Sequence, residues 1–371
     1  MINTTYYQDL TKMNTFGMKV KARCFMEYDS VADLVDIEFE ELARPVLHIG
    51  GGSNLLFTDD FKGTVLHSKI NFIEILEDCT PSRHCEERSD VAICPNVLVS
   101  VGAGVVFDDF CAWAAKEGLW GVENLSYIPG EVGASAVQNI GAYGVEVKDV
   151  IHKVYCYDTI EEEFVSFGVE ECEYGYRDSI FKDPEVKGRY IVTHVVFALS
   201  RTPQPRLEYG HLRDAVMASS ARHCEEGQSP DVAIFTPSMI RKVIIKLRKE
   251  KLPEPSVMGS AGSFFKNPVI SAEHFARIEA AAKAELGSDY KVPHYDLPDG
   301  TVKVPAAWMI EQCGWKGRRS GGAAVYDKQP LVIVNYTGDA YPEEIVGLER
   351  RIIASVKAKF DIDLHPEVEH V

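Results

Sequence analysis

The sequence predicts an α+β fold in which strands dominate the first part of the chain and helices the last part. Up to about residue 200, short runs of β-branched residues alternate with glycines, as in strands joined by turns. After about residue 237, apolar residues recur every three to four positions, as in amphipathic helices. The length of 371 residues suggests two or three domains.

Strands are expected in five stretches of the first part. They are PVLHI, GTVLHS, NVLVSV, VIHKVYCYD and RYIVTHVVFAL. One helix is expected among them, at about 107–117, where Asp108 and Asp109 suit the positive end of the helix dipole.

Helices are expected in the second part at SMIRKVIIKLRKEK, SAEHFARIEAAAKAEL and VPAAWMIEQC, and a strand at PLVIVNY. The last helix has one apolar face, made of Ile345, Leu348, Ile352, Val356 and Phe360. We expect domains at 1–215 and 238–371, joined by a linker at 216–237.

The charge of the chain argues against nucleic-acid and membrane-surface partners. With 56 acidic and 39 basic side chains, the net charge is −17, which repels phosphate backbones and anionic headgroups. An anionic substrate would need Lys, Arg and backbone N–H groups gathered locally. The N-terminus is polar and no apolar run reaches membrane length, so we expect a cytoplasmic protein.

A short sequence occurs twice, as SRHCEERSDVAI at 82–93 and ARHCEEGQSPDVAI at 221–234. Both copies are polar and aperiodic, which favours insertions in surface loops, at about 79–95 and 216–237. The alternative is a metal site formed by the two His-Cys pairs, His84/Cys85 and His223/Cys224. The nine cysteines contain no C-x-x-C pair, so we expect reduced thiols and no metal.

Two glycine-rich segments are candidate cofactor loops. HIGGGSN at 48–54 could aim backbone N–H groups at a phosphate, although a simple turn between strands is the more common explanation. It matches neither the Rossmann fingerprint nor a P-loop. The longer loop at 123–144 carries Gly130, Gly133, Gly141 and Gly144, and its small side chains Ser135 and Asn139 could line a flat cofactor ring.

Together with NTFG at 14–17, these segments resemble the flavin-binding half of the enolpyruvyl reductases of peptidoglycan synthesis, the MurB family. Further motifs follow in the family's order: GYRDSIF, LEYGHL, KLPEP, GSAGSFFKNP, IEQCGWKG, GGAAV and HPEV. The resemblance implies an FAD-binding domain of the vanillyl-alcohol-oxidase/PCMH type at 1–215, made of two α+β subdomains. A smaller substrate-binding domain then follows at 238–371, and its last residues return to the active site.

The resemblance also implies the chemistry: non-covalent FAD carries hydride from NADPH to UDP-N-acetylglucosamine enolpyruvate, giving UDP-N-acetylmuramate. It assigns the cofactor to Gly50, Gly51, Gly52, Ser53, Asn54, Gly130, Gly133, Ser135, Asn139 and Gly141. The reaction leaves negative charge beside the substrate carboxylate, and a guanidinium suits that group because it donates two parallel hydrogen bonds. The matching positions are Arg177 for the carboxylate, Ser263 for the proton and Glu367 as the partner of Ser263.

Substrate contacts are implied at Tyr209, Lys251 and Asn267, and more weakly at Tyr176 and Gln329. The segment that contains Tyr209 points to the longer, tyrosine-loop subclass. Nicotinamide is expected to share the substrate pocket, since the chain has no separate dinucleotide fingerprint, and ping-pong kinetics would follow.

Two other functions compete with this one: an oxidase of the same flavin fold, and a nucleotide-sugar-binding protein without catalysis. The first would need a different C-terminal half and often a covalent flavin, and the second is disfavoured by the three catalytic residues.

The second insertion is expected to tune substrate binding and to be dispensable for chemistry. Since four residues follow Glu367, we expect a catalytic tail less anchored than in longer relatives. Monomer is the default oligomeric state.

Overall fold

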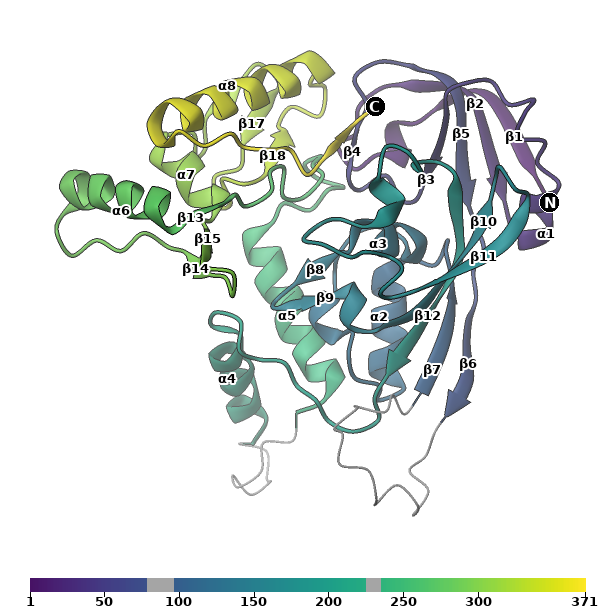
Figure 1. The fold of residues 1–371 in the computed structure, drawn as a ribbon, viewed down its shortest axis with the longest axis horizontal. Coiled ribbons are helices and arrows are strands. Elements are labelled where there is room, and N and C mark those ends of the chain that lie inside the picture. The colour runs from purple at the N-terminus through teal and green to yellow at the C-terminus, as the bar shows by residue number, and fades with distance from the viewer. Residues whose placement is uncertain (79–96, 225–234) are drawn as a thin grey trace. The chain divides into compact units, whose positions relative to one another are not determined.

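The computed structural model describes residues 1–78, 97–224 and 235–371, and for residues 77–78 and 220–224 only the backbone. The chain forms an α+β protein (Figure 1). The first repeated segment lies outside the described residues, as do residues 225–234 and the side chains of the second His-Cys pair. The possible metal site formed by those pairs is therefore outside the described part as well.

The contacts divide the chain into two compact units that are interleaved in sequence. Unit 1 contains residues 1–8, 22–51 and 62–250, and unit 2 contains residues 9–21, 52–61 and 251–371. The boundaries of the folding domains expected at 1–215, 216–237 and 238–371 stay a prediction.

The first sheet of unit 1 has four strands in the order β1-β2-β5-β3. They are β1 (Asn3–Asp9), β2 (Lys21–Tyr28), β5 (Phe61–Ser68) and β3 (Val46–Ile49), and β3 runs parallel to β5. The short helix α1 (Val31–Val35) begins at Ser30, whose hydroxyl accepts a hydrogen bond from the N–H of Asp33. Tyr28, Leu34 and Leu66 are fully buried beneath this sheet.

The second sheet of unit 1 has five antiparallel strands in the order β11-β10-β12-β7-β6. They are β11 (Glu163–Gly168), β10 (Ile151–Asp158), β12 (Tyr190–Leu199), β7 (Val97–Gly102) and β6 (Ile73–Asp78). Strand β6, at the edge of this sheet, pairs antiparallel with β7.

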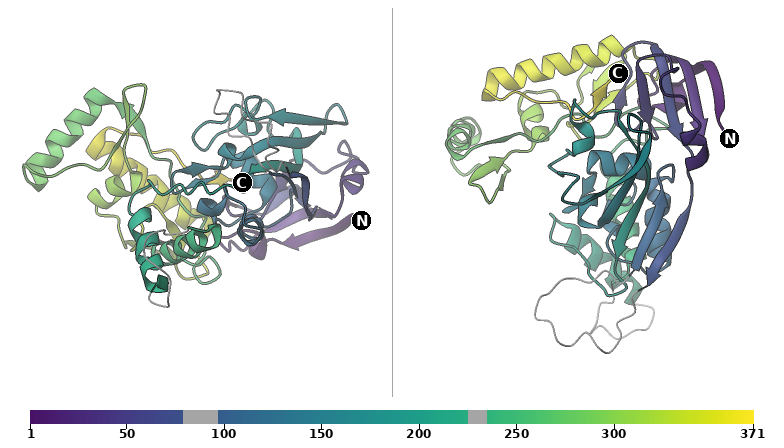
Figure 2. Two further views of the ribbon diagram at one scale, coloured as in Figure 1. Left: turned by 90° about the horizontal axis from the view of Figure 1, so that it is seen from below. Right: turned by 45° about the vertical axis from the view of Figure 1, so that its right-hand side comes forward.

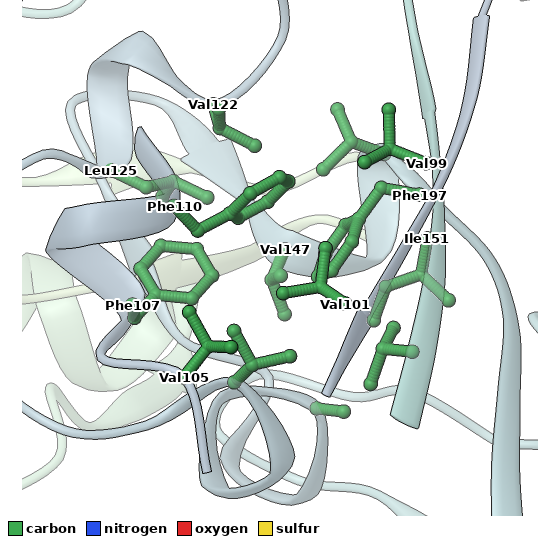
Figure 3. Close-up of a cluster of buried hydrophobic side chains, with 14 of the residues drawn as sticks. Val99, Val101, Val105, Phe107, Phe110, Val122, Leu125, Val147, Ile151 and Phe197 are labelled. Carbon is green, nitrogen blue, oxygen red and sulfur yellow. The ribbon is translucent and has the colours of Figure 1, made fainter. Parts of the chain in front are cut away.

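Two helices cover one face of this sheet, α2 (Phe107–Lys116) and α3 (Val132–Gln138) (Figure 1). Their apolar side chains enclose the main core of unit 1 together with valines of the strands (Figure 3). At its centre the rings of Phe110 and Phe197 lie 4.6 Å apart, and Phe107 meets Phe110 edge to face at 6.1 Å.

Unit 1 is completed by the pair β8 (Gly141–Ala142) and β9 (Val145–Glu146) and by α4 (Leu212–Cys224) and α5 (Pro237–Lys251). Leu212 and Val216 of α4 are buried in one cluster with Ile240, Val243 and Ile244 of α5.

Unit 2 contains three small sheets and three helices. The sheets are β13 (Val269–Ser271) with β15 (Thr301–Lys303) and β14 (Tyr295–Asp296); β16 (Arg319–Ser320) with β17 (Ala323–Val325) and β18 (Ile333–Asn335); and β19 (Glu369–His370) with β4 (Leu55–Leu56). The helices are α6 (Ala272–Leu286), α7 (Ala306–Gln312) and α8 (Pro342–Phe360), the last being the long yellow helix in Figure 2.

The expected secondary structure is largely confirmed. Helices α2, α5, α6, α7 and α8 occupy the predicted segments, and the five residues of the predicted apolar face of α8 are all buried. The strand expected at PLVIVNY is shorter, since only Ile333–Asn335 pairs as a strand. The prediction of a continuous loop at 123–144 is wrong, because α3 lies within it. Its Val132 and Ala136 are fully buried, and this core contact orders the segment as a helix.

No helix within the described residues is long and apolar enough to span a membrane. Of the described cysteines, Cys24, Cys111, Cys156 and Cys172 are buried free thiols and Cys313 is a half-buried one. Burial raises the pKa of the Cys111 thiol, as expected for a structural cysteine.

Candidate active site: glycine segments, a cradled arginine and the C-terminal tail

The first glycine segment is divided between the two units. In unit 1, a Cβ on Gly51 would lie 3.4 Å from the Cα of Gly130, so the two glycine segments meet backbone to backbone. In unit 2, Gly52 has a φ of +59°, and a Cβ there would lie 1.9 Å from the carbonyl oxygen of Met13. Glycine is therefore required at Gly52 by both conformation and space.

The second glycine segment is built around α3. A Cβ on Gly133 would lie 2.9 Å from the Cβ of Ala103, so glycine lets α3 pack closely on the unit 1 core. The Ser135 hydroxyl donates to the Val132 carbonyl at 2.7 Å. The Asn139 amide donates to the carbonyl oxygen of Gly175 at 2.8 Å. Ser135 and Asn139 are thus held by internal hydrogen bonds, and their predicted cofactor contacts stay a prediction.

Arg177 lies against the end of this segment. Its guanidinium donates to the carbonyl oxygens of Asn139 at 3.1 Å and Gly141 at 2.6 Å. A Cβ on Gly141 would lie 2.9 Å from Nη1 of Arg177, so glycine makes room for the guanidinium. Arg177 also has a φ of +55°, in the left-handed region that a non-glycine residue adopts at a cost in free energy. The arginine is therefore cradled in unit 1 by the glycine segment.

Two of the predicted substrate residues lie in the same unit. The guanidinium of Arg177 stands 5.6 Å from the ring centre of Tyr176. Tyr209 is 46% exposed, and its ring meets that of Tyr143 edge to face at 6.1 Å. Gly144 lets Tyr209 approach, since a Cβ on the glycine would lie 3.4 Å from the Cβ of Tyr209.

The sequence interpretation overlooked Arg248, which lies on α5 near these tyrosines. Its Nε donates to the carbonyl oxygen of Tyr127 at 3.0 Å. Burial lowers the pKa of Arg248, and the charge of Arg177 contributes in the same direction. The sequence contains one indication that Arg248 faces the protein interior: it lies four residues after Ile244, on the apolar face of α5. A half-buried arginine near Arg177 adds positive charge that suits an anionic substrate.

In unit 2, Ser263 precedes two buried phenylalanines, Phe264 and Phe265, whose rings lie 5.1 Å apart. The N–H of Phe264 donates to the carbonyl of Leu331 at 2.8 Å, and Gly262 before the serine has a φ of +71°. The Ser263 loop is thus anchored on one side by apolar burial and turns sharply on the other.

The C-terminal segment pairs directly with this loop. The N–H of Glu367 donates to the carbonyl of Phe264 at 2.8 Å, and Pro366 forms an isolated β-bridge with Phe265. The structure thereby brings Glu367 beside the residue that follows Ser263.

Backbone and side-chain contacts within unit 2 hold the C-terminal tail, and the expectation that it is less anchored than in longer relatives stays a prediction. Strand β19 pairs in parallel with β4, and the amide of Asn54 donates to the carbonyl oxygen of Glu367 at 3.1 Å. The imidazole of His370 lies 3.1 Å from the carboxylate of Glu349 on α8. Backbone pairing with distant segments holds the tail, which nothing in its local sequence indicates.

The NTFG motif also belongs to unit 2 and contains a second residue that the sequence interpretation did not single out. The N–H of Thr15 donates to the carbonyl of Gly52 at 3.1 Å. Within the described part of the chain, the Thr15 hydroxyl is buried and has no hydrogen-bond partner. An unsatisfied buried hydroxyl costs free energy, so this atom suits a polar group of a ligand.

The remaining predicted substrate residues, Lys251, Asn267 and Gln329, are dispersed in unit 2. Asn267 accepts a hydrogen bond from the N–H of Ala306 at 2.9 Å, at the start of α7. Gln329 forms a turn in which its carbonyl oxygen accepts from the N–H of Val332 at 3.0 Å. Lys251 is exposed at the end of α5.

A cavity of about 440 Å³ in unit 2 lies among α6, α7 and the end of α8. It is lined by Trp308, Phe360, Arg277 and Lys359 among others, and by none of the predicted site residues. In the described ranges, no three His, Cys, Asp or Glu side chains gather as ligands of a metal would. The candidate chemistry therefore rests on the glycine segments, on Arg177, and on the backbone pairing of Phe264, next to Ser263, with Glu367.

These residues suit a large, flat, phosphate-bearing cofactor such as FAD. In unit 1, Gly51 and Gly130 meet with backbone alone, as in loops that let a backbone come close to a ligand. In unit 2, the Thr15 hydroxyl is buried without a partner among the described residues, and the Thr15 N–H donates to the carbonyl of Gly52.

The fold and these features define the chain as an FAD-binding oxidoreductase. Residues 23–162 match the family model of an FAD binding domain, and residues 254–371 match that of the UDP-N-acetylenolpyruvoylglucosamine reductase C-terminal domain. A solved structure of that reductase (MurB) from Thermus caldophilus superposes with a TM-score of 0.61 at 22% identity. It covers 100% of this chain and 98% of its own, and it shows the shared fold.

Curated relatives identify the family. UDP-N-acetylenolpyruvoylglucosamine reductase of Bacteroides fragilis strain YCH46 is 47% identical over 363 residues, covering 98% of each chain. The enzyme of Porphyromonas gingivalis strain ATCC 33277 is 42% identical over 98% of this chain and 97% of its own. The chain belongs to the UDP-N-acetylenolpyruvoylglucosamine reductase family.

Proposed function

We propose that this protein reduces UDP-N-acetylglucosamine enolpyruvate to UDP-N-acetylmuramate, with NADPH as reductant and non-covalent FAD as carrier, in peptidoglycan precursor synthesis. The observation that carries the proposal is the relationship to the Bacteroides fragilis reductase, at 47% identity over 98% of both chains. A flavin oxidase or a catalytically inactive binding protein would not be expected to share both halves with a reductase at this level.

The cofactor would be held by the first glycine segment, Gly50 to Asn54, and by the second, Gly130 to Gly141. When bound, FAD supplies the hydride that it has received from NADPH. The chain's own residues then have to hold the enolpyruvyl group, stabilise negative charge and deliver one proton.

Arg177 is suited to the first two tasks. Two carbonyl contacts, to Asn139 and Gly141, fix the guanidinium before any substrate arrives. A fixed guanidinium can bind the substrate carboxylate and stabilise the charge that grows there as hydride reaches the terminal carbon of the double bond. Because the donors are already oriented, little reorganisation is required during the reaction.

Ser263 would hold the proton on its Oγ and deliver it to the carbon beside the carboxylate. A serine hydroxyl is a weak acid, so this transfer needs a partner that orients it. The backbone hydrogen bond from the N–H of Glu367 to the carbonyl of Phe264 supports this role for Glu367. Tyr209, Lys251 and Asn267 would hold the UDP moiety, and Tyr176 and Gln329 are weaker candidates for the same role. Tyr209 would make the chain a member of the tyrosine-loop subclass.

An anaerobic titration tests the proposal in two steps. We expect the purified protein to show a visible flavin band that NADPH bleaches and that UDP-N-acetylglucosamine enolpyruvate restores. A flavin that NADPH reduces but the sugar nucleotide cannot reoxidise would contradict the substrate. A protein without flavin would contradict the function as a whole.

Cytoplasmic location and a monomeric state complete the proposal, since both substrates are soluble anions. Light scattering of the purified protein should return the mass of one chain, 41.3 kDa. Twice that mass would contradict the monomeric state but would not bear on the proposed reaction.

A further inference from the structure

A buried histidine links the first sheet of unit 1 to the second glycine segment. His67, on β5, has a side chain that is 8% exposed. Its Nε2 lies 2.9 Å from Oε1 of Glu131, and its Nδ1 lies 3.0 Å from Oε1 of Glu27. A carboxylate only accepts hydrogen bonds, so both ring nitrogens carry protons and the imidazole is charged.

The surrounding groups support the charged form. Burial alone lowers the pKa of His67, but Glu131 and Glu27 outweigh it and raise the pKa. Lys69 lies 3.5 Å from the outer carboxylate, Glu27. On β3, burial lowers the pKa of the neighbouring His48 to about 4, so that ring is neutral, and its Nε2 lies 2.7 Å from the hydroxyl of Tyr28.

Glu131 connects the His67 ring to the glycine segments. It is the residue directly after Gly130 and the N-cap residue of α3. Its other carboxylate oxygen, Oε2, would lie 3.2 Å from a Cβ placed on Gly50. The carboxylate is therefore confined between the His67 ring on one side and the first glycine segment on the other.

We infer that His67 is a positioning residue for the flavin: by holding the Glu131 carboxylate against Gly50, it fixes the two glycine segments in the arrangement that binds the cofactor. The inference rests on the assignment of these segments to FAD. It gives the cofactor site a dependence on pH through the protonation of His67. A group whose pKa is raised by folding contributes fully below its unfolded value, and the contribution is lost as pH rises through the folded value.

The experiment measures the dissociation constant of FAD from the apoprotein between about pH 6 and pH 9, where an imidazole loses its proton. In the unsubstituted protein, binding should weaken at the alkaline end. In His67→Leu it should be about tenfold weaker than in the unsubstituted protein at the acidic end, the effect of one lost charge-assisted hydrogen bond. Because this variant has no pH dependence from His67, the affinities of the two proteins should converge toward the alkaline end.

Two further variants distinguish the effect of the contact between His67 and Glu131 from general effects of charge. In Glu131→Gln, the amide can donate to Nε2 of a neutral ring while Nδ1–H still donates to Glu27, so the alkaline weakening should disappear. Lys69→Gln is the control, because it removes a charge beside Glu27 without touching Glu131, and its pH profile should match the unsubstituted protein.

If the melting curve of the apoprotein shows that His67→Leu does not fold, the pH profile of FAD binding by Glu131→Gln tests the inference by itself. Alkaline weakening that persists in Glu131→Gln, or equal FAD affinity at the acidic end in a folded His67→Leu, would overturn the inference. An unsubstituted protein that binds no FAD would instead overturn the flavin assignment, so the two failures are distinguishable without an activity assay.

Discussion

The polar side chains of the site differ in whether they already form hydrogen bonds within the protein. Ser135 and Asn139 use their side chains in internal hydrogen bonds, whereas the Thr15 hydroxyl is buried with no partner among the described residues. Buried polar atoms in folded proteins are nearly always paired. The exceptional residue is therefore the one from which a ligand contact is most directly inferred.

Thr15→Val should have opposite effects on the stability of the apoprotein and on its affinity for FAD. Valine has the shape of threonine without the hydroxyl, so the apoprotein should gain about 1 kcal/mol in its free energy of unfolding. The same change should weaken FAD binding about tenfold, since the ligand loses one hydrogen bond. Melting curves and FAD titrations measure both. Thr11→Val is the control, because the Thr11 hydroxyl already donates to Asp9; FAD affinity unchanged in Thr15→Val would refute the contact.

Ser263→Ala should affect only half of the proposed reaction. Reduction of the flavin band by NADPH should proceed at the unsubstituted rate, because no proton from Ser263 is needed for it. Return of the band with the enolpyruvyl sugar nucleotide should slow by about 10²- to 10⁴-fold, the usual contribution of a general acid. Stopped-flow spectroscopy separates the two rates, and equal slowing of both would indicate a structural defect.

Among the elements, β19 is a two-residue strand that holds the segment carrying Glu367. Its two residues pair with β4, and Glu367 lies just before them. A two-residue strand has little stability of its own, so contacts from other elements have to hold it. The contact between His370 and the buried Glu349 of α8 is such a contact within unit 2.

Glu349→Leu should therefore loosen the tail. The amide protons of Glu369 and Val371, which bond to Asn54 and Leu56, should exchange faster with solvent. The second half-reaction should slow, while FAD affinity stays unchanged. Glu343→Leu, at an exposed position of the same helix, is the control and should leave exchange of these amides as it was. Unaltered exchange in Glu349→Leu would show that backbone pairing alone holds the tail.

At the scale of the whole molecule, the sequence predicts that the segment between α4 and α5 is an insertion dispensable for the chemistry. Residues 225–234 join α4 to α5, outside the described elements. Lengthening such a connection costs little, because loop-closure entropy grows only slowly with length. Deleting 225–234 should change the KM for the sugar nucleotide but leave NADPH reduction of the flavin within about twofold. Steady-state and half-reaction kinetics test this, and a lost hydride step would make the segment part of the chemistry.

The sequence by itself determined the α+β class, the positions of the long helices and of five strands in the two sheets of unit 1, and the order of motifs that places the chain in its family. These features are local, since hydrophobic period and glycine spacing are set by neighbouring residues. The apolar face of α8 is an example: each buried member lies three or four residues from the next.

Only the tertiary structure decided which side chains are already bound within the protein and which positions depend on distant partners. His67 and Glu131 are separated by 64 residues, and Asn54 and Glu367 by 313. Such pairs leave no periodic signal, because they form only after sheets and loops have packed. The same reason explains α3, which forms in a glycine-rich segment because Val132 and Ala136 find a core to enter.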